Sequence, residues 1–150
     1  MEYTIENPQI PFSLSELTNF IDEASLNSYA TESVEARTPE TDGYKVLKYE
    51  NGDWEYEDKY TGYARSWGSE TVKYKGEIVW KVVYGGGMIE EIPEGVFAHR
   101  GPEHFEEGKW HYSSKTHGDI TYFHGDEEIS FEGKVVFFHR FIGGLVIANS

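Results

Sequence analysis

Apolar residues near the N-terminus recur at the spacing of one helical face. The stripe comprises Leu14, Leu17, Phe20, Ile21 and Ala24. Ser13 precedes it and Glu16 follows three residues later, which is the capping-box pattern found at the start of helices. Apolar positions three or four residues apart are typical of an amphipathic helix that packs on a core. We therefore expect one helix within residues 13–30.

From residue 44 onward, apolar and polar residues alternate with the period of two that is typical of β-strands. Asn51-Gly52 separates two such runs, and this dipeptide is the strongest short signal for a β-hairpin. In the second run one face carries Trp54, Tyr56, Asp58 and Tyr60. Glycines at position 68 and at positions 85–87 are expected to break or end their strands. The region therefore predicts antiparallel strands joined by short turns.

The strand pattern occurs twice along the chain. Residues 49–89 and residues 105–146 can be aligned, with His124 as the one inserted residue. The alignment pairs Gly52 with Gly108, Trp54 with Trp110, Tyr56 with Tyr112, Glu70 with Glu127, and Gly86-Gly87 with Gly143-Gly144. Two copies of this length are too short to fold separately, so they should share one core.

The predicted fold is mainly β. It is an internally duplicated antiparallel β-barrel or sandwich with pseudo-twofold symmetry and one N-terminal α-helix packed on it. The chain is expected to form a single domain over residues 1–150, with a first β repeat at 44–89 and a second at 105–146. The same symmetry is compatible with a homodimer.

The composition excludes several classes of function. The chain of 150 residues has a net charge of −14 and no cysteine. Because phosphate neutralisation requires clustered Lys and Arg, we expect no nucleic-acid partner. No stretch predicts a signal peptide or a membrane span, which favours a cytoplasmic protein without a membrane partner. The six histidines lack metal-binding spacing, so we expect no metal and no cofactor.

Two glutamates occupy equivalent positions in the two copies. Glu70 and Glu127 each alternate with apolar residues, so each should point to the buried side of the sheet. A buried carboxylate needs hydrogen bonds or a positive partner. The two residues either serve the fold, or bind a polar ligand, or carry acid–base chemistry. Asp58 is a further candidate, because the second copy has Ser114 there and such divergence marks a place to look for a site.

Aromatic residues make up 16% of the chain and supply most of the remaining candidates. Those that could stack on a planar ligand are Trp54, Tyr56, Tyr60, Trp80, Trp110 and Tyr112. Arg37, Arg100 and Arg140 could fix an anionic group of that ligand, and Arg37 and Arg100 could instead pair with the inward glutamates. The aromatics either line a cavity or fill a solid core, and a filled interior is usual in small barrels.

Several motifs together resemble a bacterial domain-of-unknown-function family. They are Arg37-Thr38-Pro39, the run from Tyr49 to Gly62, Gly68-Ser69-Glu70-Thr71-Val72, the run from Trp80 to Gly86, Arg100-Gly101-Pro102 and Gly143-Gly144. The chain departs from that family by a shorter segment between the copies and by a triple glycine at a strand end. The family occurs as stand-alone proteins and behind helix-turn-helix regulators of the XRE type. The resemblance implies a small-molecule sensor, since domains behind such regulators often bind a ligand.

Three functions are compatible with the sequence. The first is a non-enzymatic domain that binds a small-molecule ligand, for example to sense or sequester a nucleotide-type signal. The second is a hydrolase or isomerase with Glu70 and Glu127 as acid and base, which requires both carboxyl groups in one cavity. The third is an acidic protein that inhibits a basic, nucleic-acid-binding partner.

Overall fold

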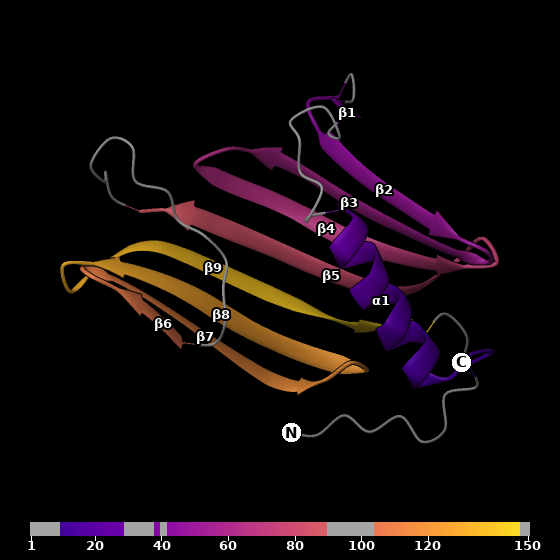
Figure 1. Ribbon diagram of the computed structural model, residues 1–150. Coiled ribbons are helices and arrows are strands. Elements are labelled where there is room, and N and C mark those ends of the chain that lie inside the picture. Colours follow the sequence, from indigo (N-terminus) through magenta and orange to yellow (C-terminus); the bar gives the residue numbers. More distant parts are fainter. Residues whose placement is uncertain (1–9, 29–37, 40–41, 90–103, 148–150) are drawn as a thin grey trace.

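The computed structural model describes residues 10–28, 38–39, 42–89 and 104–147 (Figure 1). Its elements are α1 (Leu14–Ser28), β1 (Thr38–Pro39), β2 (Lys45–Asn51), β3 (Trp54–Gly62), β4 (Arg65–Tyr74), β5 (Glu77–Met88), β6 (His104–Glu107), β7 (Trp110–Asp119), β8 (Tyr122–Phe131) and β9 (Lys134–Leu145). The prediction of a mainly β chain with one N-terminal helix is confirmed for the described residues.

All the strands belong to one antiparallel sheet of nine strands, in the order β1-β2-β3-β4-β5-β9-β8-β7-β6. Strands β2–β5 form one up-and-down meander and β6–β9 form another. The two meanders meet edge to edge through β5 and β9, where Tyr84 lies opposite Phe141. Seven of the strands are long, whereas β1 and β6 at the two edges are short.

The predicted β-barrel or sandwich is wrong, because the sheet is open. In the described part of the chain, the ladder ends at β1 on one side and at β6 on the other. A barrel would require these edges to pair. Instead, the two meanders pair with each other along β5 and β9, which makes one wide twisted sheet (Figure 1).

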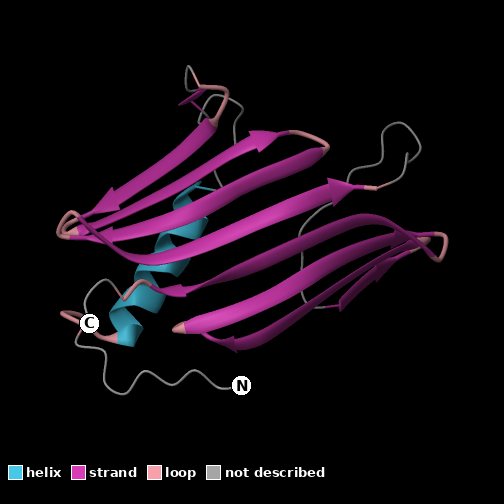
Figure 2. Ribbon diagram, turned by 180° about the vertical axis from the view of Figure 1, so that it is seen from behind, coloured by secondary structure: helices cyan, strands magenta, loops and turns pink. Residues whose placement is uncertain are grey.

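Helix α1 lies on one face of this sheet, in front of the strands in Figure 1 and behind them in Figure 2. Its buried stripe of Leu17, Phe20 and Ala24 packs in the same cluster as Tyr56 and Trp80 of the sheet. We call this side the helix face and the opposite side the outer face. Apolar residues at helical spacing thus pack against inward-facing strand residues, as the sequence pattern predicts.

A polar contact also joins the helix to the β2–β3 hairpin. Asn51 donates a side-chain hydrogen bond of 2.9 Å to the Glu23 carboxylate. Burial, followed by the hydrogen bond with Glu23, raises the pKa of Tyr49 above its ordinary value. Glu23 of α1 therefore makes polar contacts with strand β2, which lies beneath the helix.

The start of α1 has the predicted capping box. The Glu16 amide donates to Ser13 Oγ at 3.1 Å, and the Ser13 amide donates back to Glu16 Oε2 at 3.0 Å. Ser13→Ala removes one of these two bonds, so it should lower the free energy of unfolding by about 1 kcal/mol in urea denaturation. Ser15→Ala is the matched control, because Ser15 is exposed in the same turn. Equal losses in the two variants would contradict the role of the cap.

The two meanders have matching turns. Gly52 and Gly108 both have φ of 59°, and Lys75 and Glu132 have φ of 49° and 51°. A β-bulge lies at Val79 of β5, opposite the step from Val72 to Lys73, and another lies at Val136 of β9, opposite the step from Ile129 to Ser130. Positions that the sequence alignment pairs therefore adopt similar backbone conformations.

Glycines that were expected to interrupt strands lie inside continuous ones. A Cβ added at Gly68 would lie 2.7 Å from the Tyr84 hydroxyl, and one at Gly125 would lie 2.5 Å from the Phe141 ring. These positions lack a side chain because a ring from the next strand fills the space. Strand β5 likewise continues through Gly85–Gly87 to Met88.

Candidate functional site

A cavity of about 200 Å³ opens on the helix face at the centre of the sheet, where strands β4, β5, β8 and β9 lie side by side. The residues that line it are Glu70, Trp80, Val82, Tyr84, Phe123, Glu127, His139 and Phe141. Both meanders contribute to the lining, so the cavity depends on the pairing of β5 with β9.

The strand register brings the two predicted glutamates to this cavity. Glu70 of β4 lies opposite Val82 of β5, and Glu127 of β8 lies opposite His139 of β9. Because directly opposite residues share a face, both carboxylates point to the helix face. Residues 57 positions apart in the chain thus line one cavity, which is the arrangement that the equivalent positions suggest.

Each glutamate is held by a tyrosine of the neighbouring strand. The Tyr56 hydroxyl donates to Glu70 Oε1 at 2.6 Å, and the Tyr112 hydroxyl donates to Glu127 Oε2 at 2.8 Å. Both tyrosines are buried. A carboxylate with a fixed donor on one oxygen can remain in a largely buried position. The tyrosines therefore orient the carboxylates from behind and do not line the cavity themselves.

The Glu127 side of the cavity carries a histidine. His139 Nδ1 lies 3.6 Å from Glu127 Oε1, and only 2% of His139 and 8% of Glu127 are exposed. The position equivalent to His139 in the first meander is Val82, which is apolar. The imidazole therefore makes the two halves of the cavity chemically different.

The Glu70 side carries a second carboxyl group. Asp58 lies opposite Glu70 in the β3–β4 register, is 2% exposed, and accepts a short hydrogen bond from the Tyr84 hydroxyl. The second meander has Ser114 and Phe141 in place of Asp58 and Tyr84. Asp58 therefore supports the cavity through Tyr84, which lines it.

Aromatic rings form the apolar wall. Trp80 stacks on Phe123 with 5.8 Å between ring centroids, and Phe123 lies 6.2 Å from Phe141. The Trp80 indole donates to the Ile120 carbonyl at 3.0 Å, which fixes the ring across the junction between the two meanders. A planar group that enters the cavity would meet ring faces and edges on this side.

The other predicted site residues lie elsewhere. Trp54 packs under α1 against Phe12 and Phe20, and Trp110 packs on Phe131 in a second core cluster. Tyr60 lies on the helix face, but it does not line the cavity. Arg37 and Arg100 are outside the described residues. The guanidinium of Arg140 lies 5.0 Å from the Phe138 ring centroid, on the outer face.

Five lining residues were missed by the sequence analysis: Val82, Tyr84, Phe123, His139 and Phe141. Comparison of the two copies contains the signal for two of these positions. Val82 is replaced by His139 and Tyr84 by Phe141, while the surrounding pattern is kept. A comparison of every position at which only one copy has a polar residue would have identified His139.

In the described lining of the cavity, the His139 imidazole is the only basic side chain. That lining includes two carboxyl groups, and no Lys or Arg. A phosphate or carboxylate group would meet like charge in this cavity, whereas N–H donors and cations would meet acceptors. The site therefore suits a ligand that donates hydrogen bonds.

The tyrosine bonds give a direct test of this geometry. Tyr112→Phe leaves the Glu127 carboxylate without its 2.8 Å donor, so the free energy of unfolding should fall by about 1–3 kcal/mol. Tyr56→Phe should have a similar effect through Glu70. Tyr122→Phe is the control, since Tyr122 is 60% exposed. Chemical denaturation measures all three, and equal stabilities would show that the bonds contribute nothing.

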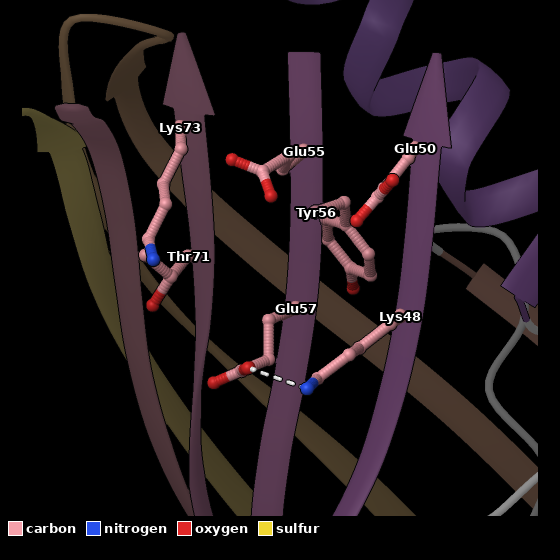
Figure 3. Close-up of a pocket in the computed structure, with 7 residues that line it drawn as sticks. All are labelled: Lys48, Glu50, Glu55, Tyr56, Glu57, Thr71 and Lys73. Carbon is pink, nitrogen blue, oxygen red and sulfur yellow. Dashed lines mark ion pairs between the residues drawn. The ribbon is translucent and has the colours of Figure 1, made fainter. Parts of the chain in front are cut away.

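A separate hollow of about 130 Å³ on the outer face has a different character (Figure 3). It is lined by Lys48, Glu50, Glu55, Tyr56, Glu57, Thr71 and Lys73. Lys48 of β2 reaches toward Glu57 of β3, with 3.9 Å between Nζ and Oε2. Positive and negative groups alternate here, so this part of the surface does not present the continuous acidic face that a polyanion mimic would need.

The described residues contain no group of three His, Cys, Asp or Glu side chains that could hold a metal ion. Within the same residues, no helix has the length and apolar character needed to cross a membrane.

Fold and site together define an open antiparallel β-sheet protein with an acidic, aromatic-walled cavity at its centre. A family model described as a domain of unknown function, DUF5680, matches residues 93–146. The resemblance to a domain of unknown function is thereby confirmed for this part of the chain, which includes Glu127 and His139. No curated protein and no solved structure matches the chain.

Proposed function

We propose that this chain is a small-molecule-binding module whose ligand occupies the central cavity. The observation that carries the proposal is the convergence of Glu70 and Glu127, from the two meanders, on one aromatic-walled cavity. A concave, mostly apolar site with a few fixed polar groups is the usual form of a ligand pocket.

The ligand class follows from the lining. Carboxylate oxygens accept hydrogen bonds, so the ligand carries N–H groups on opposite edges or a delocalised positive charge. Aromatic walls favour a flat ring system. The volume of about 200 Å³ is below the roughly 300–1,000 Å³ of sites for drug-sized molecules. A single amino-substituted heterocycle, or that part of a larger ligand, matches these requirements.

A nucleotide-type signal belongs to this ligand class because its base is a flat heterocycle that can carry N–H groups. An amino-bearing nucleobase would enter the cavity, while its phosphates would stay outside because of the negative lining. A module of this kind could sequester the signal as a stand-alone chain. Behind a helix-turn-helix regulator it could transmit the signal, and this association remains part of the proposal.

We further propose that the two meanders arose by internal duplication. Their matching turn dihedrals and bulge positions support this origin. Duplication accounts for two glutamates at equivalent positions around a pseudo-twofold axis. Divergence at His139 and Asp58 would then have adapted a symmetric cavity to an asymmetric ligand.

Isothermal titration with two matched probes tests the binding proposal. The first probe is 2-aminobenzimidazole, which presents a planar N–C–N donor edge. The second is 2-methylbenzimidazole, which has the same ring system without the amino group. We expect saturable binding of the first probe. The second probe should bind about tenfold more weakly, because it lacks the amino group and so loses one charge-assisted hydrogen bond, worth ~1.5 kcal/mol or more. Absent or equal binding of both probes would argue against the proposed ligand class.

A second candidate function is catalysis by the same two glutamates. The observation that favours it is the shared cavity, which also holds His139 beside Glu127. In this reading one carboxyl group donates a proton and the other accepts one. Mass analysis of the small molecule recovered after prolonged incubation with the protein separates the two functions. An unchanged ligand supports binding alone, and a converted one supports an enzyme.

A further inference from the structure

A larger groove, of about 440 Å³, lies on the outer face of the same sheet. It is lined by Tyr44, Lys59, Trp67, Gly68, Ser69, Lys81 and Val83. Ser69 and Val83 lie opposite each other in the β4–β5 register and form its floor, and Lys59 lies opposite Ser69 on the β3 side. The groove therefore crosses three strands behind the central cavity.

Lys81 is the unusual group in this groove. Lys81 is half-buried as a residue, and its ammonium donates to Thr71 Oγ1 at 2.8 Å and to Ser69 Oγ at 3.3 Å. These acceptors are neutral, and no carboxylate of the described residues pairs with Lys81. Lys48 and Lys109, by contrast, each have a glutamate partner. In a chain of net charge −14, a fixed ammonium without a carboxylate marks a position for an anion from outside.

An apolar platform lies next to this ammonium. Trp67 is 59% exposed and Val83 is 52% exposed, although both have large apolar surfaces. The indole of Trp67 lies directly on Gly85, where an added Cβ would be 2.2 Å from Cε3. Because Gly85 has no side chain, the Trp67 ring can lie flat on the sheet, and its other face is left for a ligand to stack on.

The opposite wall adds a second positive group. Lys59 Nζ lies 3.2 Å from Asp42 Oδ2 and 4.9 Å from the centroid of the Tyr44 ring. The Asp42 pair offsets the charge of Lys59, so Lys81 is the stronger attraction for an anion. Tyr44 and Trp67 then border the groove with aromatic edges.

We propose that this groove binds a small planar aromatic anion, with its anionic group at Lys81 and its ring on Trp67. This ligand has the opposite charge preference to the ligand of the central cavity, so the second site does not depend on the first. The competing occupant is a second copy of the chain, since Ile142 of β9, opposite Val83, and Tyr122 of β8 extend the exposed apolar surface beyond Val83.

The test follows the Trp67 indole N–H by NMR while 2-naphthoate is added. The Trp67→Phe variant assigns the resonance, because the chain has four tryptophans. We expect saturable shifts with a Kd of order 1 mM or tighter, and about tenfold weaker binding by Lys81→Met. Lys73→Met, an exposed lysine of the outer face outside this groove, should bind as the unchanged protein does.

Three results would overturn the proposal. One is the absence of saturable shifts, and another is equal affinity for the neutral analogue 2-naphthylmethanol, which would leave only an apolar surface. The third is a dimer in sedimentation velocity that Trp67→Ala dissociates, because the groove would then be an interface between copies. Binding of 2-aminobenzimidazole in the central cavity is read out separately and should be unchanged in Lys81→Met.

Discussion

Replacing Glu70 and Glu127 together by glutamine should lower the affinity for 2-aminobenzimidazole by about 100-fold or more. Each carboxylate is expected to contribute one charge-assisted hydrogen bond, worth ~1.5–3 kcal/mol, and each 1.4 kcal/mol changes the affinity tenfold. Glutamine retains an oxygen that accepts the tyrosine hydroxyl, so the side chains should keep their positions. Isothermal titration measures the effect.

Two controls make this result specific to the cavity. Glu57→Gln removes the same charge from the outer face, where Glu57 pairs with Lys48, and should leave the affinity unchanged. Compared without ligand, the double variant should melt no lower than the unchanged protein, because it loses two carboxylates from a crowded, partly buried region. An unchanged affinity in a folded double variant would show that the glutamates serve the fold alone.

Gly86→Ala should have the largest effect on stability, a loss of about 3 kcal/mol or more in the free energy of unfolding. Gly86 has φ of 134°, a conformation that L side chains rarely adopt. A Cβ at this position would also lie 2.1 Å from the Phe138 carbonyl oxygen of β9. Because Gly86 lies opposite His139, the substitution would push apart the two strands that form the cavity. Urea denaturation followed by tryptophan fluorescence measures the loss.

Gly76→Ala separates backbone strain from the steric clash. Gly76 also has a positive φ, of 82°, but no atom would lie within 4 Å of an added Cβ. The expected loss is therefore only about 1 kcal/mol, from the left-handed conformation alone. If the two variants lost the same stability, the close approach of β5 and β9 at Gly86 would not matter for the fold.

The local elements were predictable because local sequence determines them. Ser13 and Glu16 make the capping box that their spacing predicts. A hairpin also forms beside the Asn51-Gly52 signal, although its turn residues are Gly52 and Asp53 and only Gly52 has the positive φ that a type I′ turn needs at both positions. The shared face of Trp54, Tyr56 and Asp58 follows from the period of two. These features depend on contacts a few residues apart.

The open sheet was not predictable in this way. Whether two meanders close into a barrel or join edge to edge depends on which outer strands find partners. No local pattern distinguishes β5 pairing with β9 from other arrangements. Gly68 gave a misleading signal for the same reason, since the Tyr84 ring that excludes a side chain there comes from another strand.

The candidate site was predictable in part. Repeat alignment singled out Glu70 and Glu127, and the structure brings both to one cavity. The high aromatic content does not distinguish residues of the cavity wall from residues of the hydrophobic core, because Trp80 and Trp54 follow the same alternating pattern in their strands. Only the helix position decides between them: α1 covers Trp54, whereas Trp80 also reaches the cavity.

Native mass spectrometry of the protein purified gently from its own cells tests the central claim most directly. The account predicts an additional mass that leaves on denaturation, belongs to an amino-bearing planar compound, and is missing from the Glu70→Gln, Glu127→Gln double variant. Loss of that mass should also lower the melting temperature, as expected for a ligand that binds only the folded chain. A clean apo mass, with no thermal shift by 2-aminobenzimidazole or by nucleosides, would contradict the proposal that the central cavity binds a ligand.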